Sequence, residues 1–315
     1  MHLINCCDHI VDHSNANDQS GFVIVPPETR GVLPKFFRLT SIARFPAKNG
    51  KGVWNEAAVY YDATSLKVGW PSATVDSRLT RGSIVTILFD RRRLALPDRF
   101  SVIKVERIDE PFAGLNLFKG IPQAWINDRE LASRAARLWE RLDRPFAHLL
   151  NAVLWDGLRF FRYITSPVSI ASEPLPVGTN FRYAVSLAEQ ALLLADGLPD
   201  IDRNVLIVAG LLRDAGKGDG FKRMPDGGLN LTERGKWIGH QQTVLEWLAV
   251  ARGRAIIPDE SYYRLMHVLL ALINPAVMPI SVEVAFLKAA ASFVESPVRF
   301  RSVAKDVSEA PYSLK

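Results

Sequence analysis

The chain changes character once along its length, from short β-type segments to longer helical ones. Between Lys35 and Glu110, β-branched and aromatic residues gather in short runs that Gly, Asp, Asn or Pro separate. The runs fall at residues 36–39, 57–62, 66–70, 83–89 and 100–105. Five strands in so short a segment are typical of a small closed barrel. We therefore predict an OB-like five-stranded β-barrel in this part of the chain.

From Leu131 onward, hydrophobic residues recur at three- and four-residue steps, which is the spacing of one helix face. Pro145 is expected to start or break a helix within this pattern. Further helical segments are expected at residues 181–194, 203–212, 235–251, 261–272 and 282–294. Turn clusters lie between them. The pattern predicts an all-α region after the barrel, and hence a multidomain α and β protein.

These changes divide the chain into segments. We expect a flexible N-terminal arm, an OB-fold-like domain, a helical connector, a larger helical domain and a C-terminal tail, at residues 1–34, 35–110, 111–170, 171–296 and 297–315. No internal repeat and no low-complexity tract interrupts this order.

Composition indicates a soluble globular protein. Hydrophobic residues make up 48% of the chain and aromatic residues 10%, which argues against disorder. The formal net charge of +6 is compatible with a polyanionic partner. No apolar run approaches the ~18 residues of a membrane span, so we expect no membrane partner. The only cysteines are the adjacent Cys6 and Cys7, which cannot form a disulfide framework, so we expect a cytoplasmic location.

The barrel segment interleaves cations with aromatic residues. Proteins that bind single strands need cations to follow the phosphates and aromatic faces to stack the bases. The residues expected to contact a single-stranded nucleic acid are Lys48, Lys51, Trp54, Tyr61, Trp70, Arg91, Arg92 and Arg93. The alternative is an inert or protein-binding barrel, in which arginines only solvate an edge. Strand alternation places one of Tyr60 and Tyr61 inside in either case.

A second cluster of polar residues follows the apolar run Val205–Leu212, which ends in Arg213-Asp214-Ala215-Gly216-Lys217. His240 and His267 come later in the chain. In order and spacing, these residues and the preceding segment 176–185 resemble an HD-type metal-dependent phosphohydrolase domain. With a barrel before it, the arrangement is similar to that of YhaM-type 3′–5′ exoribonucleases, over roughly residues 35–295.

In that family, His and Asp side chains hold one or two divalent cations, which activate a water molecule and clamp the phosphate. Carried over position by position, the first ligand His falls at or near Tyr183, and the central His-Asp pair falls on Arg213 and Asp214. The later His positions match His240 and His267. The resemblance thus leaves three side chains that could act as ligands.

Besides Tyr183, two positions depart from the family pattern. The closing Asp should fall at residues 289–292, where no carboxylate stands. The guanidinium of Arg213 is permanently charged, so it cannot bind a cation and repels one nearby. We therefore expect Arg213 to supply the positive charge that a metal supplies in the family, paired with Asp214 or with a phosphate. Lys217 adds to this anion-binding pocket.

Three hypotheses follow. The first is a nucleic-acid-binding protein that prefers single strands, whose HD-like domain is a pseudo-enzyme acting without a cofactor as a phosphate-binding or assembly scaffold. The second is a metal-dependent phosphodiesterase, a 3′–5′ exonuclease. In it Asp214, His240 and His267 hold Mn²⁺ or Zn²⁺, while Arg213 and Lys217 stabilise charge on the phosphate. The third is a protein-partner module of a mobile-element or defence complex, because HD-like segments of some conjugative-element proteins look similar.

Overall fold

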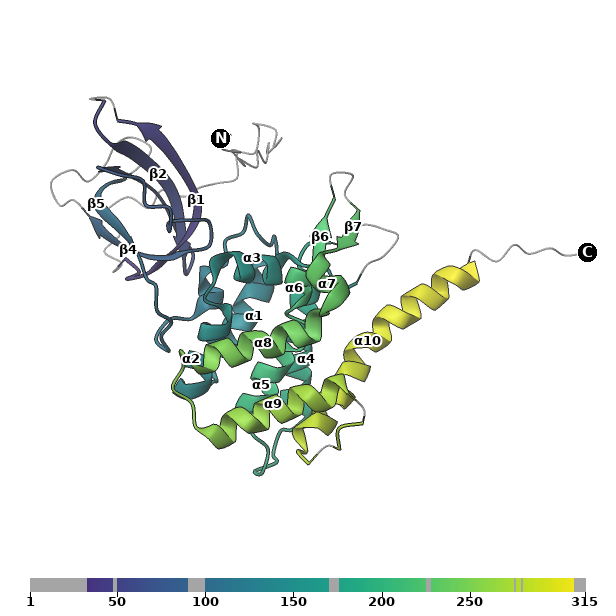
Figure 1. Cartoon of the computed structure of the whole chain (residues 1–315). Coiled ribbons are helices and arrows are strands. Elements are labelled where there is room, and N and C mark those ends of the chain that lie inside the picture. Colours follow the sequence, from purple (N-terminus) through teal and green to yellow (C-terminus); the bar gives the residue numbers. More distant parts are fainter. Residues whose placement is uncertain are drawn as a thin grey trace, which may run out of the picture.

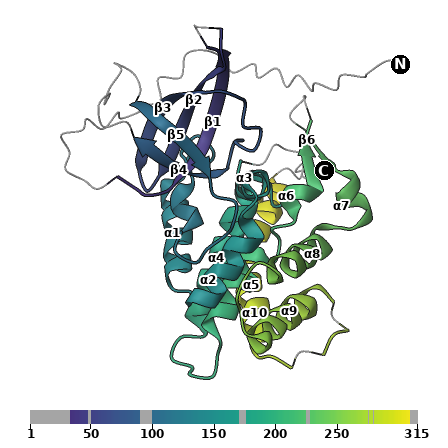
Figure 2. The ribbon, with the colours of Figure 1, turned by 60° about the vertical axis from the view of Figure 1, so that its left-hand side comes forward.

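The computed structural model describes residues 33–47, 50–89, 100–169, 176–224, 228–274, 276–278 and 280–308; of Arg223 and residues 296–308, the backbone alone is described. A closed β-barrel comes first in the chain, and a larger helical body follows it (Figure 1). In a second view the barrel lies at one end of the helical body, next to α1 (Arg129–Glu140) and α3 (Gly157–Thr165) (Figure 2).

The barrel closes in the order β1-β2-β3-β5-β4. Its strands are β1 (Phe37–Pro46), β2 (Val53–Tyr61), β3 (Thr64–Ser72), β4 (Ile84–Phe89) and β5 (Phe100–Arg107). Strands β3 and β5 pair in parallel, and the other neighbours pair antiparallel. Alternate residues such as Val59, Leu66 and Val68 fill the interior, as the period of a strand requires. The expected five-stranded, OB-like barrel is confirmed.

The helical body contains more elements than the sequence pattern predicts. Its remaining elements are η1 (Leu117–Gly120), α2 (Arg144–Leu154), α4 (Thr179–Leu194), α5 (Arg203–Leu212), α6 (Lys217–Gly220), β6 (Phe221–Arg223), β7 (Leu229–Leu231), α7 (Glu233–Trp237), α8 (His240–Arg252), α9 (Asp259–Ile273) and α10 (Glu283–Ser308). Aspartate side chains cap the N-termini of α1, α2, α3 and α5 by accepting backbone N–H bonds. The expected helix at residues 235–251 is interrupted at Gly239, whose φ of 81° is incompatible with a continuous helix.

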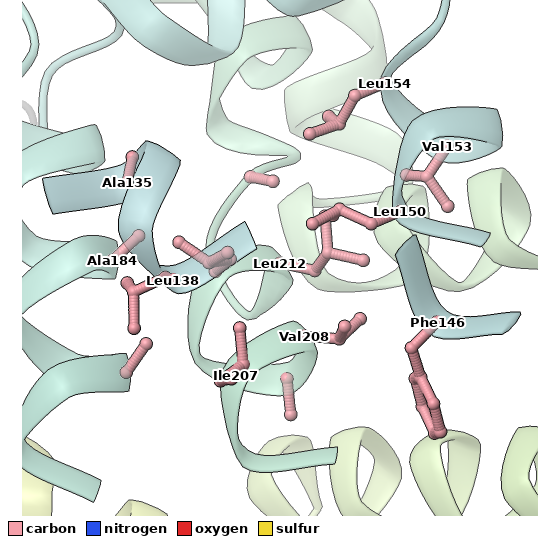
Figure 3. Close-up of a cluster of buried hydrophobic side chains, with 14 of the residues drawn as sticks. Ala135, Leu138, Phe146, Leu150, Val153, Leu154, Ala184, Ile207, Val208 and Leu212 are labelled. Carbon is pink, nitrogen blue, oxygen red and sulfur yellow. The ribbon is translucent and has the colours of Figure 1, made fainter. Parts of the chain in front are cut away.

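One hydrophobic core runs through the whole helical body. Leu150 and Val153 of α2 lie beside Val208 and Leu212 of α5, with the side chains of α1 and α4 close by (Figure 3). The helices of the expected connector therefore share their core with those of the segment that follows. Helix α10 likewise continues across the boundary expected at residue 296.

Arg38 on β1 lies at the centre of the junction between barrel and helical body. It is 0% exposed and donates hydrogen bonds to the carbonyl oxygens of Gly82 (2.9 Å), Gly120 (3.1 Å) and Leu117 (3.3 Å). Its guanidinium lies 4.0 Å from the ring centroid of Phe160 in α3. Burial lowers the pKa of Arg38 to about 9, so the group remains protonated at neutral pH. One cation thus joins the barrel to η1 and α3.

Two glycines make a close backbone contact at the same junction. A Cβ on Gly82 would lie 2.5 Å from the carbonyl oxygen of Gly157, and Gly82 has a φ of 89°. Because any larger residue at Gly82 would meet backbone atoms of α3, glycine is needed here for the barrel to seat on the helices.

Candidate functional site

The loop after α5 carries the acidic residue that the sequence singled out. Helix α5 is buried on all sides, and Asp214 follows it with 6% exposure. The amide nitrogen of Asn180, in α4, donates to the Asp214 carbonyl (3.0 Å) and to Ser166 Oγ (3.1 Å). A Cβ on Gly216 would lie 2.0 Å from the carbonyl oxygen of His240. Gly216, two residues after Asp214, thus allows this loop to contact the first turn of α8.

The carboxylate of Asp214 is held by two side chains. Nε2 of His240 lies 3.2 Å from Oδ1, and the ammonium of Lys217 lies 3.4 Å from Oδ2. Burial alone would raise the pKa of Asp214, but the hydrogen bond from His240 and the charges of Lys217 and Arg213 outweigh it and lower the pKa to about 2. The carboxyl group of Asp214 is therefore ionised at any physiological pH, and the neighbouring positive charges balance its negative charge.

Arg213 points to a different set of partners. One terminal nitrogen donates to the hydroxyl of Tyr183 (3.0 Å), which in turn donates to Oε1 of Glu295 on α10 (3.0 Å). Burial raises the pKa of Tyr183 above its ordinary value, and the nearby Arg213 opposes that shift. Tyr183 therefore stays protonated and links the guanidinium to a carboxylate. The charge of Arg213 also acts on Asp214, so the two groups belong to one network.

Glu295 was missed by the reasoning from sequence. The carboxylate was sought at residues 289–292, and Glu295 lies about one helical turn further along α10. The available signal was its helical spacing from that stretch.

His267 does not belong to the network. Its Nε2 accepts a hydrogen bond from the backbone N–H of Ile280 (3.2 Å), at the other end of the loop that follows α9. Among the residues that the structure describes, no group of three His, Cys, Asp or Glu side chains could hold a metal ion. The structure therefore brings Asp214 and His240 together, while His267, the third member of the alternative ligand set, is held elsewhere.

The remaining residues do not suit Mn²⁺ or Zn²⁺. A catalytic zinc site takes three protein ligands, and here Asp214 and His240 supply two. The ammonium of Lys217, 3.4 Å from the carboxylate, occupies a position that a cation would need. No catalytic step through a metal can be derived from this arrangement.

Two buried polar atoms beside Asp214 lack a hydrogen-bond partner within the described part of the chain. They are Nε of Arg213 and Oδ1 of Asn180. A buried donor or acceptor left unpaired costs about 1–3 kcal/mol, so such atoms normally bind water or a ligand. Arg213 thus keeps one buried N–H without a partner among the described residues.

On the barrel, the expected contact residues separate into two groups. Trp54 lies on the outer surface of β2, where it faces Phe45 of β1 and Pro71 of β3 across the sheet. Phe45 is 47% exposed, and Trp54 donates to the carboxylate of Glu56 (3.0 Å). Lys51 is exposed in the loop between β1 and β2. Phe45, which the sequence pattern did not single out, completes this surface.

Two aromatic residues lie elsewhere. Trp70 is 4% exposed in the barrel core, so its assignment as a stacking residue is corrected. Tyr61 is partly buried between the barrel core and the helical core, and burial raises its pKa to about 12. It is a junction residue with little surface to offer a base. Lys48 and the three arginines at residues 91–93 lie outside the described residues.

Comparison with known proteins found no relative of the chain. No family model, no curated protein and no solved structure matches the chain. Among the described residues, no helix combines the length and hydropathy that crossing a membrane requires.

Proposed function

We propose that the protein binds single-stranded nucleic acid on the outer aromatic face of its barrel, the surface formed by Phe45, Trp54 and Pro71 with Lys51 at its edge. The surface pair of exposed Phe45 and half-buried Trp54 carries this proposal. In OB folds, strands 2 and 3 and the loops joining strands 1–2 and 4–5 contact nucleic acid. Here the aromatic pair adjoins the first of these loops. Flat rings at the surface beside a cation suit stacked bases and a phosphate backbone.

We further propose that the helical body is a degenerate HD-type domain that serves as a scaffold. Tyr183, Arg213, Asp214 and His240 converge, and each stands where the family has a ligand. Two of the four cannot bind a metal, since one is a guanidinium and the other a protonated phenol. The charge that a cation would supply comes instead from Arg213 and Lys217. In this proposal, the domain has kept its affinity for anions and has lost its hydrolytic activity.

The barrel proposal predicts a specific loss of binding. Trp54→Ala should weaken binding of a fluorescently labelled single strand roughly 5- to 150-fold, because stacking on one aromatic ring contributes about 1–3 kcal/mol. Fluorescence anisotropy measures the dissociation constant. Binding by the wild type should also weaken steeply as salt increases.

Trp237→Ala is the matched control. Trp237 is 83% exposed on α7 and, like Trp54, its indole N–H faces a glutamate, Glu233, at 3.3 Å. The control should bind like the wild type. Equal binding by wild type and Trp54→Ala, or no binding by the wild type at low salt, would refute the proposal.

A further inference from the structure

A cleft of about 320 Å³ lies between the end of the barrel and the helical body. The polar side chains along it include Tyr60, Asp62, Lys119, Arg129, Arg137 and Glu140. Phe118, Ile121 and Ile126 provide an apolar floor. Small-molecule sites are often found between domains, with apolar walls and a few polar groups. The cleft is separate from the outer aromatic face, because Trp54 and Tyr60 are at opposite ends of β2, roughly 20 Å apart.

A strained turn forms one wall of this cleft. Asp62 and Ala63 connect β2 to β3, and both have positive φ, 47° and 65°. The left-handed conformation is unfavourable for alanine, and glycine or asparagine usually takes such positions. The backbone N–H of Asp62 donates to the carbonyl oxygen of Lys119 (2.9 Å), which ties the turn to η1. Strain of this kind persists where the surrounding structure enforces it, often at ligand sites.

The charges are arranged differently at the two ends of the cleft. At one end, Arg129 donates to the hydroxyl of Tyr60 (3.2 Å) and has no acidic partner among the residues described. At the other end, the ammonium of Lys119 lies 3.0 Å from Glu140 and 3.8 Å from Asp62. Arg129 and Glu140 are separated by the length of α1, about 16 Å. The cleft therefore offers an anion-binding end, an apolar middle and an end rich in acceptors.

We propose that this cleft binds a nucleoside monophosphate. The guanidinium of Arg129 presents N–H groups that match phosphate oxygens, and the hydroxyl of Tyr60 adds a further donor. The base and sugar lie on the apolar floor. Ribose hydroxyl or base amino groups donate to the carboxylates of Asp62 and Glu140. The site is independent of nucleic-acid binding on the outer aromatic face.

Isothermal titration calorimetry of the full chain with adenosine monophosphate tests this proposal. The wild type should bind the nucleotide, and adenosine or inorganic phosphate alone should bind more weakly. Arg129→Gln should reduce the affinity at least roughly tenfold, because it removes the charge-assisted hydrogen bonds to phosphate. Arg141→Gln is the control: Arg141 follows α1 but does not line the cleft, so this variant should bind like the wild type.

Two further variants separate this site from the barrel face. Tyr60→Phe removes one hydroxyl without changing the packing of the ring, and it should weaken nucleotide binding even if Arg129→Gln were poorly folded. Trp54→Ala should leave nucleotide binding unchanged. The proposal is overturned if the wild type shows no binding at about 1 mM nucleotide. It is equally overturned if Trp54→Ala abolishes binding while Arg129→Gln retains it.

Discussion

Arg38→Met is expected to remove a large part of the chain's stability. The methionine can lie on Phe160, but the carbonyl oxygens of Gly82, Gly120 and Leu117 lose their shared donor. Each buried carbonyl left unpaired costs about 1–3 kcal/mol, so a loss of roughly 3–9 kcal/mol is expected for the three. The whole stability of a folded domain is about 5–15 kcal/mol. Urea unfolding followed by tryptophan fluorescence measures the difference, and Trp125 lies next to this side chain.

The control for this prediction is Arg44→Met on the same strand. Arg44 also donates to two carbonyl oxygens, those of Asp76 (3.0 Å) and Leu79 (2.8 Å), but its side chain is exposed. Because water can donate to these carbonyl oxygens in place of the exposed Arg44 side chain, the expected loss in the free energy of unfolding is below about 1 kcal/mol. If both variants unfold at the same urea concentration as the wild type, then Arg38 does not hold the barrel to the helices.

Asp214→Asn is expected to have the largest effect among substitutions in the candidate site. The amide keeps the shape of the carboxyl group but leaves the ammonium of Lys217, whose side chain is 13% exposed, without a counter-ion. Breaking a buried ion pair by removing one partner costs about 3–5 kcal/mol. Glu106→Gln, which removes the exposed pair with Lys104, should cost less than about 1 kcal/mol.

The pH dependence gives the same prediction a second readout. The pKa of Asp214 is about 2 in the folded chain and 3.8 as an ordinary value, so the unfolded state binds the proton first as the pH falls. The carboxylate's contribution is therefore fully present above about pH 4 and is lost between about pH 4 and pH 2. It amounts to about 2 kcal/mol. Asp214→Asn should lack this part of the acid sensitivity. Identical pH profiles for the two proteins would contradict the assigned network.

The barrel could be predicted from sequence because its strands are short, β-branched and separated by turn residues. Which side of the barrel wall each aromatic residue lies on could not be predicted. Trp54 and Trp70 lie on paired strands, yet Trp54 faces Pro71 while Trp70 faces Asn55. A one-residue difference in register exchanges inside and outside. The hydrophobic pattern contains no information on register that would have separated the two tryptophans.

The candidate site, too, could be predicted from sequence only in part. Arg213 and Asp214 could be located because a fully buried helix must end in polar residues. The partner of Asp214 depends on tertiary structure: the helix break at Gly239 and the close approach of Gly216 together place His240 beside the carboxylate. Glu295 reaches Tyr183 only because α10 packs along α4. Spacing along the chain does not encode such contacts, and it could not show that His267 lies apart from Asp214 and His240.

We propose that the protein holds single strands and does not cut them. The most direct test is to incubate a labelled single strand with wild-type protein and Mn²⁺, and to resolve the products on a denaturing gel. Asp214→Asn is run beside it at a temperature where both proteins are folded. We expect a full-length strand in both lanes. A strand that the wild type shortens and Asp214→Asn leaves intact would show that Asp214 supports hydrolysis, and the scaffold proposal would be wrong.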